Sequence, residues 1–153
     1  MPARSPAHPL EAHLGYWLRL VSNQVSGTFA RALQDRRVSV AEWVALNLIG
    51  QAEDLTPATL ADAMGMTRGA ITKVLDKLEA KDWAARTPHA DDSRVQMLSL
   101  TRRGQRVLPE LTAIADANDA HFFAPLNARE QATLRTLLAK LANAYQIDSL
   151  PTD

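Results

Sequence analysis

The chain has 153 residues and no cysteine, and its 17 lysine and arginine residues balance 17 aspartate and glutamate residues. This length fits one ordinary domain, and a hydrophobic content of 46% is enough for a packed core. The lack of cysteine excludes disulfides, a thiol nucleophile and cysteine-based zinc or redox sites. Because no run of 18 apolar residues and no apolar signal segment is present, a soluble, cytoplasmic protein is expected.

The charges are unevenly distributed along this neutral chain. Residues 67–106 contain nine basic and five acidic side chains, a net charge of +4, and the rest of the chain carries −4. A local basic segment is typical of a small nucleic-acid-binding element within a larger scaffold. A solvated helix face with mixed charges would show the same pattern, so the charge alone leaves both interpretations open.

The first half of the chain is predicted to be helical. Apolar residues recur at spacings of three and four from Leu10, which predicts a long helix that ends near Gln34. Ser39 followed by Glu42 is a capping box that begins a second helix, and Gly50 is its predicted stop.

Two further helices are predicted on either side of a tight turn. Thr56 and Pro57 are an N-cap and a first helical residue, and Gly65 ends this short helix. Thr67 caps the next helix after about two residues, and this helix buries one apolar stripe: Ile71, Val74, Leu75 and Leu78.

A β-hairpin is predicted next, with strands at residues 83–87 and 95–100 around a polar loop at 88–94. Asp82 can take a left-handed conformation before the first strand, at some strain. Thr101 then caps a long helix, and Pro125 separates it from a last helix with an apolar stripe that includes Leu134, Leu137, Leu138, Leu141 and Tyr145.

This order of elements predicts a mainly α fold with a small β-hairpin wing, a winged helix-turn-helix. In that motif, the second helix of the pair enters the major groove of DNA with its first turns. The candidate contacts there are Thr67, Arg68, Gly69, Thr72 and Lys73, with Lys77 better placed for a phosphate. At the wing tip, Arg94 is a candidate for an adjacent minor groove.

Arg102 and Arg103 are also candidate DNA contacts. They stand in the first turn of a predicted helix, where the helix dipole disfavours cations, and a bound phosphate would offset that cost. Simple solvation of both side chains is the alternative.

The segment from Ser39 to Gly104 closely resembles the multiple-antibiotic-resistance-regulator (MarR) family of bacterial transcription factors. The matching strings are VSVAEWVALNLI, TLADAMGMTRGAITKVLDKLEAKD and the wing DDSRVQMLSLTRRG. The resemblance implies an obligate homodimer with interlocked terminal helices, bound to pseudo-palindromic operators whose recognition helices stand one helical turn, about 34 Å, apart. It also implies that Asp92 braces Arg94, and it gives these candidate dimer residues: Leu10, Leu14, Leu134, Leu137, Leu141 and Tyr145.

The resemblance further implies release of DNA, most often as a repressor, when a small aromatic acid binds between the dimer helices and the DNA-binding lobe. The aromatic candidates for this site are His13, Tyr16, Trp17 and Trp43. Trp17 and Trp43 also lie on apolar stripes, so a place in the core is the alternative for both. No metal site is expected, because the four histidines form no short-spaced pair, and no cofactor is implied.

The sequence also bears on two other classes of function. An enzyme is not expected, because the sequence has no phosphate-binding glycine loop, no nucleophile elbow and no paired carboxylates on an apolar face. The remaining alternative is a dimeric helical interaction module without DNA binding, which would tend to have lost the basic first turn of the recognition helix. The predicted organisation is a flexible tail (1–9), an N-terminal dimerisation helix (10–37), the DNA-binding lobe (38–103), C-terminal dimerisation helices (104–147) and a second tail (148–153).

Overall fold

The computed structural model of the chain describes residues 9–148 and 150–152. Most of the predicted N-terminal tail, and residues 149 and 153 of the C-terminal one, lie outside this part. The elements are a 3-10 turn and six α-helices with one hairpin: η1 Pro9–Ala12, α1 Leu14–Gln34, α2 Val40–Gln51, α3 Pro57–Met64, α4 Arg68–Ala80, β1 Ala84–Pro88, β2 Gln96–Leu100, α5 Arg102–Phe122 and α6 Ala128–Ala144.

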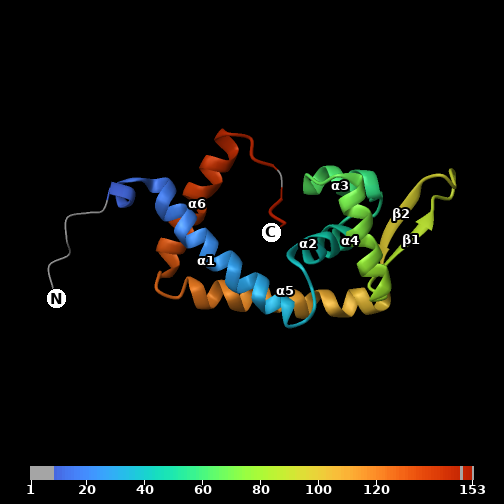
Figure 1. The fold of residues 1–153 in the computed structure, drawn as a ribbon, viewed down its shortest axis with the longest axis horizontal. Helices are drawn as coiled ribbons and strands as arrows, with labels where there is room; N and C mark the ends of the chain where they lie inside the picture. The colour runs from blue at the N-terminus through green and yellow to red at the C-terminus, as the bar shows by residue number, and fades with distance from the viewer. Residues whose placement is uncertain (1–8, 149, 153) are drawn as a thin grey trace.

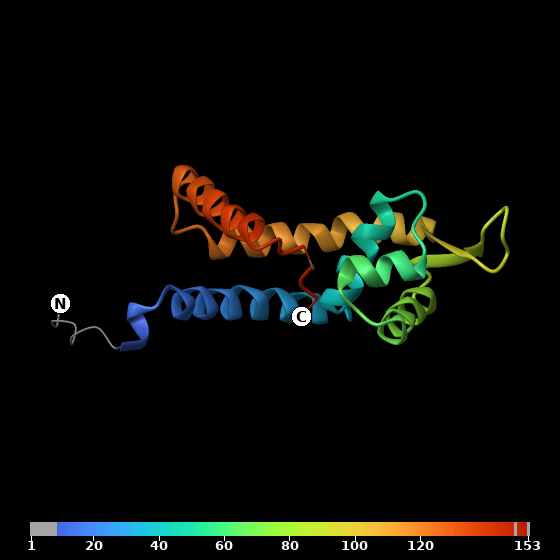
Figure 2. The ribbon, with the colours of Figure 1, turned by 90° about the horizontal axis from the view of Figure 1, so that it is seen from above.

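The elements form a lobe at one end of an elongated molecule (Figure 1). Helices α2, α3 and α4 and the hairpin make up the lobe, and α1, α5 and α6 extend away from it. Seen from above, the hairpin projects from the end opposite to α6 (Figure 2). Among the residues that the structure describes, no helix has the length and hydropathy needed to cross a bilayer.

The first helix begins four residues later than the sequence predicts. His13 is the N-cap of α1, with an extended backbone, and Leu10 belongs to the separate turn η1. Local hydrogen bonds hold this turn: the Trp17 Nε1–H donates to the Glu11 carbonyl at 2.8 Å, and His13 Nδ1 lies 3.1 Å from the Pro9 carbonyl. The predicted end at Gln34 is confirmed.

Gly50 does not stop the second helix, as the sequence predicted, because α2 continues to Gln51. A Cβ at Gly50 would lie 3.1 Å from side-chain atoms of both Leu100 and Leu108. The glycine therefore serves the close approach of α2 to β2 and α5. The capping box between Ser39 and Glu42 is confirmed in both directions.

The hydrophobic core lies inside the lobe and reaches into the long helices. Leu33 near the end of α1 and Leu111 of α5 are fully buried with the apolar faces of α2, α3 and α4. Val107 of α5 is buried in the same cluster. The predicted boundary between residues 103 and 104 thus falls at the start of α5, whose first turns still pack in the lobe.

The hairpin is antiparallel, and its strands start one residue later than predicted, at Ala84 and Gln96. The left-handed Asp82 is confirmed, with φ 57°, and it turns the chain from α4 into β1. Thr101 secures the base of the hairpin: its hydroxyl donates to the Asp82 carbonyl and its backbone N–H donates to the Trp83 carbonyl.

Candidate nucleic-acid interface

Helix α4 divides into a buried apolar face and an exposed polar one. Ile71, Val74, Leu75 and Leu78 are buried, as predicted. Thr67 caps the helix by accepting a hydrogen bond from the Ala70 N–H at 3.2 Å. The predicted contact residues of this helix are all exposed and are therefore accessible to a partner: Thr67, Arg68, Gly69, Thr72, Lys73 and Lys77.

Gly69 stands in the first turn of α4 with nothing within 4 Å of the place where a Cβ would be. Its backbone angle is not one of the positive φ values found in the chain. Since glycine costs a helix about 0.5–1 kcal/mol relative to alanine, nothing inside the lobe explains its presence. A surface without side-chain atoms at this point suits the close approach of a phosphate or a base to the free N–H groups of the helix start.

The wing tip carries the expected pairing of Asp92 with Arg94. Asp92 Oδ1 accepts from both the backbone N–H and the Nε–H of Arg94, each at 3.1 Å. These bonds from Arg94 lower the pKa of the Asp92 carboxyl below its ordinary value. The Arg94 side chain is 90% exposed, so the aspartate sets its direction while the guanidinium stays available to a partner.

Arg102 and Arg103 lie at the other end of the hairpin, in the first turn of α5 directly after β2. Both are exposed, and among the described residues neither side chain takes part in a hydrogen bond or ion pair. The predicted basic residues of the lobe therefore frame the hairpin at its tip and at its base.

Two other basic residues of the segment 67–106 are bound inside the lobe instead. Lys81 Nζ donates to the Arg37 carbonyl at 2.6 Å and pairs with the buried Glu42 at 3.1 Å. Arg86 of β1 pairs with Asp76 and Glu79 of α4 at 2.8 and 2.7 Å. Sequence reasoning counted these side chains as part of the basic patch, because it does not show which acids lie beside them.

The four aromatic candidates for ligand binding are not brought together. Tyr16 and Trp17 contact each other edge to face near the start of α1, beside His13. Trp43 of α2 packs instead against Phe29, with ring centroids 5.0 Å apart. Because Phe29 is twelve residues beyond Trp17 on one helix, the two groups are about 18 Å apart along its axis. Within one chain the four candidates therefore form two separate groups.

Of these residues, Trp43 lines a cavity. This cavity, of about 350 Å³, lies between α1 and α2, and Phe29, Asn47 and Leu150 also line it. The Trp43 Nε1–H is buried without an acceptor, whereas the Trp17 Nε1–H is already bonded. A buried N–H without an acceptor is costly, so Trp43 carries an unsatisfied polar group beside this cavity.

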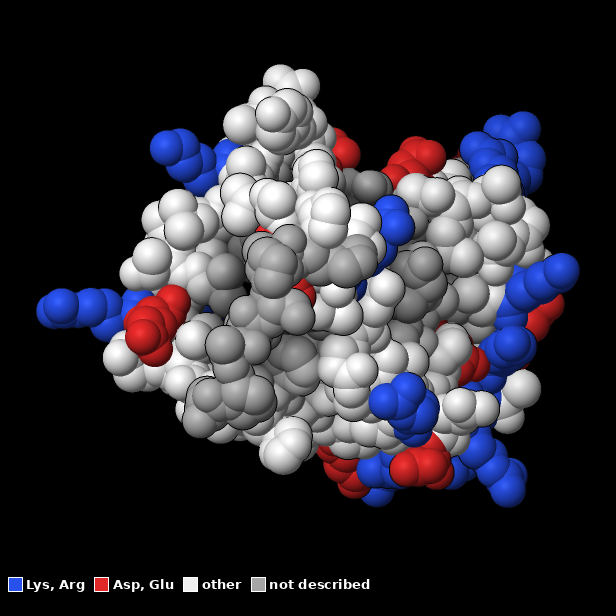
Figure 3. All heavy atoms as spheres, turned by 60° about the vertical axis from the view of Figure 1, so that its left-hand side comes forward, with Lys and Arg blue, Asp and Glu red and all other residues white. Residues whose placement is uncertain are grey.

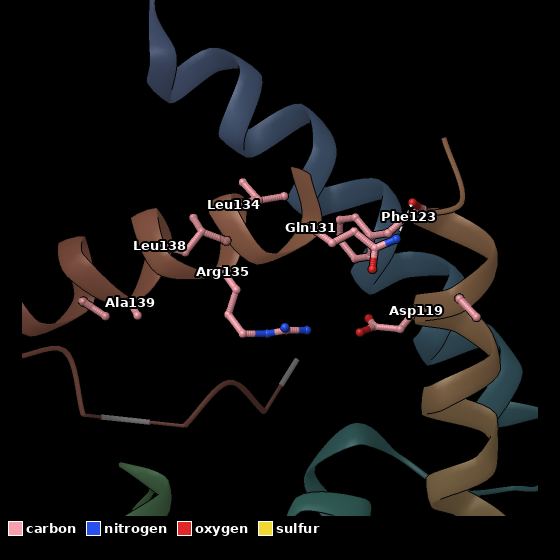
Figure 4. A pocket seen from close by; sticks show the side chains of 9 residues that line it. Asp119, Phe123, Gln131, Leu134, Arg135, Leu138 and Ala139 are labelled. Carbon is pink, nitrogen blue, oxygen red and sulfur yellow. Dashed lines mark hydrogen bonds between the residues drawn. The ribbon is translucent and has the colours of Figure 1, made fainter. Parts of the chain in front are cut away.

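A second cavity, of about 480 Å³, opens between the end of α5 and α6 (Figure 4). Phe123, Leu134 and Leu138 supply apolar walls, and Arg135 and Asp119 point toward one another across it. Leu134 belongs to the apolar stripe predicted for the last helix, but the sequence does not predict the hollow beside it.

Helix α6 is amphipathic but buries none of its residues within the chain. The exposed fraction is 51% for Leu141 and 75% for Tyr145, and on α1 it is 88% for Leu14. Figure 3 shows this end of the molecule, where the described side chains near the centre are mostly uncharged. Large apolar side chains exposed to this extent on two helices indicate an interaction site.

Comparison with known proteins identifies the family of this chain. A sequence model of the MarR family matches residues 38–95. The HTH-type transcriptional repressor Rv2887 of Mycobacterium tuberculosis is 31% identical over 133 residues, which are 87% of this chain and 96% of the relative. The chain belongs to the MarR family.

Solved structures of MarR proteins have the same fold. A mutant of Escherichia coli MarR complexed with operator DNA superposes with a TM-score of 0.72 at 27% identity, over 84% of this chain and 92% of that one. The M. tuberculosis Rv2887 complex with p-aminosalicylic acid superposes with a TM-score of 0.69 at 30% identity, over 85% of this chain and 98% of that one. The winged helix-turn-helix predicted from the sequence is confirmed.

Proposed function

We propose that this MarR-family chain acts in the cytoplasm as a homodimeric repressor of transcription that leaves its pseudo-palindromic operator when a small aromatic acid binds. The observation that carries this proposal is the exposed basic start of α4 beside a wing whose tip arginine is braced by Asp92. The named repressor relatives and the MarR–operator complex support it.

The exposed candidate residues of the lobe have distinct roles in this proposal. The start of α4, with Thr67, Arg68 and Gly69, offers a hydroxyl, a forked donor and open backbone N–H groups to phosphate and guanine. Lys73 and Lys77 follow on the same helix and take phosphates. Arg94 enters the minor groove, and the first turn of α5 meets the backbone through Arg102 and Arg103.

A second copy of the chain is the partner for α1 and α6. These helices expose the apolar stripe that the lobe does not cover, including Leu14, Leu137 and Leu141. The cavity between α5 and α6 would be filled by the partner's helices. A dimer of this kind places two recognition helices on one side of a duplex, which matches a two-fold symmetric operator.

The effector site is proposed at the cavity between α1 and α2. It joins the dimer helix α1 to the lobe helix α2, so a ligand there can change the angle between them. The unpartnered Trp43 Nε1–H would donate to a carboxylate or hydroxyl of the ligand, and the Phe29 and Trp43 rings would flank it. An Rv2887 structure with p-aminosalicylic acid favours a ligand of this chemistry.

Binding to a duplex from the region upstream of the gene tests the DNA-binding role. Fluorescence anisotropy is expected to show tighter binding to this duplex than to a scrambled one, with an affinity that falls steeply as salt rises. Arg94→Ala is expected to weaken binding about tenfold, chiefly at sites with A·T-rich flanks, because narrow minor grooves attract the guanidinium.

Lys77→Ala is the matched control, because a phosphate contact carries no sequence information. The loss of DNA affinity in this variant should be about equal at all sites. The slope of log affinity against log salt concentration should fall in magnitude by about one. Equal losses across flanks for both variants would remove the minor-groove role of Arg94. Binding no tighter than to scrambled DNA, at low salt and without effector, would instead support the non-DNA-binding interaction module.

Trp43→Phe tests the effector site, because it keeps an aromatic ring and removes the unpartnered Nε1–H donor. With p-aminosalicylic acid as the probe, the wild-type protein is expected to gain thermal stability and to release DNA. The variant should bind the probe about tenfold more weakly, as expected for a lost buried hydrogen bond. Trp17→Phe, at the far part of α1, should bind like the wild type, and an equal loss in both variants would move the site elsewhere.

A further inference from the structure

Arg86 joins the hairpin to the recognition helix at two points. Its Nε–H and Nη2–H donate to the two carboxylate oxygens of Glu79 at 2.8 and 2.7 Å, and Nη2–H also reaches Asp76 Oδ1 at 2.8 Å. Only 20% of the Arg86 side chain is exposed. A planar guanidinium held by two carboxylates fixes both distance and angle, so this contact sets the direction of β1 relative to α4.

This contact lies at the last point where the body of the lobe holds the hairpin. Arg86 pairs across the ladder with Leu98, which is buried and whose N–H donates to the Leu55 carbonyl at 2.8 Å. Beyond this pair, the hydrogen bonds and ion pairs of the described residues 87–97 all have their partners within the hairpin. A small rotation at Arg86 would therefore move the wing tip as a unit.

The same contact neutralises acidic groups on the exposed side of α4. Asp76 lies one turn after Thr72 on the same side of the helix, close to the residues proposed to meet DNA. An unpaired carboxylate there would repel the phosphate backbone. The hydrogen bond from Arg86 also holds the pKa of the Glu79 carboxyl below its ordinary value, so this partner stays ionised and the contact persists.

We propose that Arg86 is a positioning residue for DNA recognition, which holds the wing at the angle to α4 that brings Arg94 to the minor groove. Arg86 touches no DNA in this arrangement and acts through Arg94 and through the neutralised carboxylate of Asp76. The inference rests on the proposed DNA binding and adds to it a residue that neither the charge pattern nor the motif assigns.

A double-mutant cycle between Arg86→Ala and Arg94→Ala tests the inference. The dissociation constants of the four proteins are measured by anisotropy on one duplex with A·T-rich flanks. Arg86→Ala is expected to weaken binding about tenfold and to lose the preference for A·T-rich flanks. In the Arg94→Ala background, the same change should cost at least about threefold less, because the residue through which it acts is gone.

Two further variants separate positioning from general damage to the fold. Arg86→Lys keeps the charge but not the two-carboxylate geometry, so it should show a smaller loss with the same dependence on Arg94. Arg36→Ala removes an exposed ion pair with Glu110, also 2.8 Å long, and should leave binding within about twofold. Thermal unfolding of every variant establishes that it is folded before binding is measured.

Two results in folded variants would together overturn the inference: the affinity losses of Arg86→Ala and Arg94→Ala add in the double variant, and Arg86→Ala keeps the preference for A·T-rich flanks. The proposed function would still stand. Failure of the wild-type protein to prefer any duplex would overturn the proposed function itself. If Arg86→Ala does not fold, the double-mutant cycle between Arg86→Lys and Arg94→Ala tests the inference by the same criteria.

Discussion

Leu141→Glu is expected to abolish the dimer and to lower folding stability in the same variant. Leu141 lies on the exposed apolar stripe of α6, a helix that buries no residue within its own chain. A charge placed in an apolar subunit interface loses its hydration without gaining a partner, which costs several kcal/mol per subunit. Leu137→Glu, on the same stripe, should behave alike.

Sedimentation equilibrium and thermal unfolding measure the two effects together. The wild-type protein should have twice the 16.8 kDa mass of one chain, and the variants should sediment as unstable monomers or lose structure. Thr136→Glu is the matched control on the opposite side of α6, where a charge stays in water and should leave the dimer intact. A stable dimer of Leu141→Glu, or a monomer as stable as the wild type, would show that this stripe is not the subunit interface.

Gly104→Ala is expected to destabilise the lobe by about 3 kcal/mol or more. A Cβ at Gly104 would lie only 1.9 Å from the backbone oxygen of Trp83, and backbone cannot move aside as a flexible side chain would. The start of α5 therefore packs directly on the chain that enters β1. This contact gives a physical reason for the glycine in the wing motif LTRRG.

Urea unfolding at equilibrium measures this loss, and Gly69→Ala is its control. Gly69 has open space around it, so alanine should stabilise α4 by up to about 1 kcal/mol while weakening the binding of DNA. Equal stability of Gly104→Ala and the wild type would show that the base of the hairpin tolerates a shift of α5. Unchanged DNA affinity in Gly69→Ala would remove the close approach proposed at that glycine.

The sequence predicted the starts of α2, α3, α4 and α5 best, because capping chemistry is local. The cap of each of these helices accepts a hydrogen bond from a backbone N–H within the first turn: Ser39, Thr56, Thr67 and Thr101. Such bonds depend on residues three positions apart, which a single sequence displays directly. The left-handed Asp82 was open to prediction because aspartate is one of the few residues besides glycine that adopt this conformation.

The errors concern contacts between distant parts of the chain. Glycine is a residue type that often stops a helix. Gly50 instead allows α2 to approach Leu100 and Leu108 closely, and these residues are fifty or more positions away in the sequence. The contact of Arg86 with Asp76 and Glu79 depends on the turn at residue 82, which folds β1 back along α4.

The predicted aromatic site is divided within one chain for a related reason. His13, Trp17 and Trp43 all have aromatic rings, yet the length of α1 separates the first two from Trp43, which lines a cavity. Side-chain chemistry proposed the candidates, while the distance along α1 decided which neighbours each of them has.

The central claim is that one dimer presents two α4 helices to successive major grooves. Selection of bound sequences from a random duplex library, followed by sequencing, tests this claim without knowledge of the operator. We expect enrichment of an inverted repeat whose half-sites are centred about 10 base pairs apart, with A·T-rich flanks where Arg94 reaches the minor groove. Enrichment of a single unrepeated site, or none above the starting library, would contradict the account.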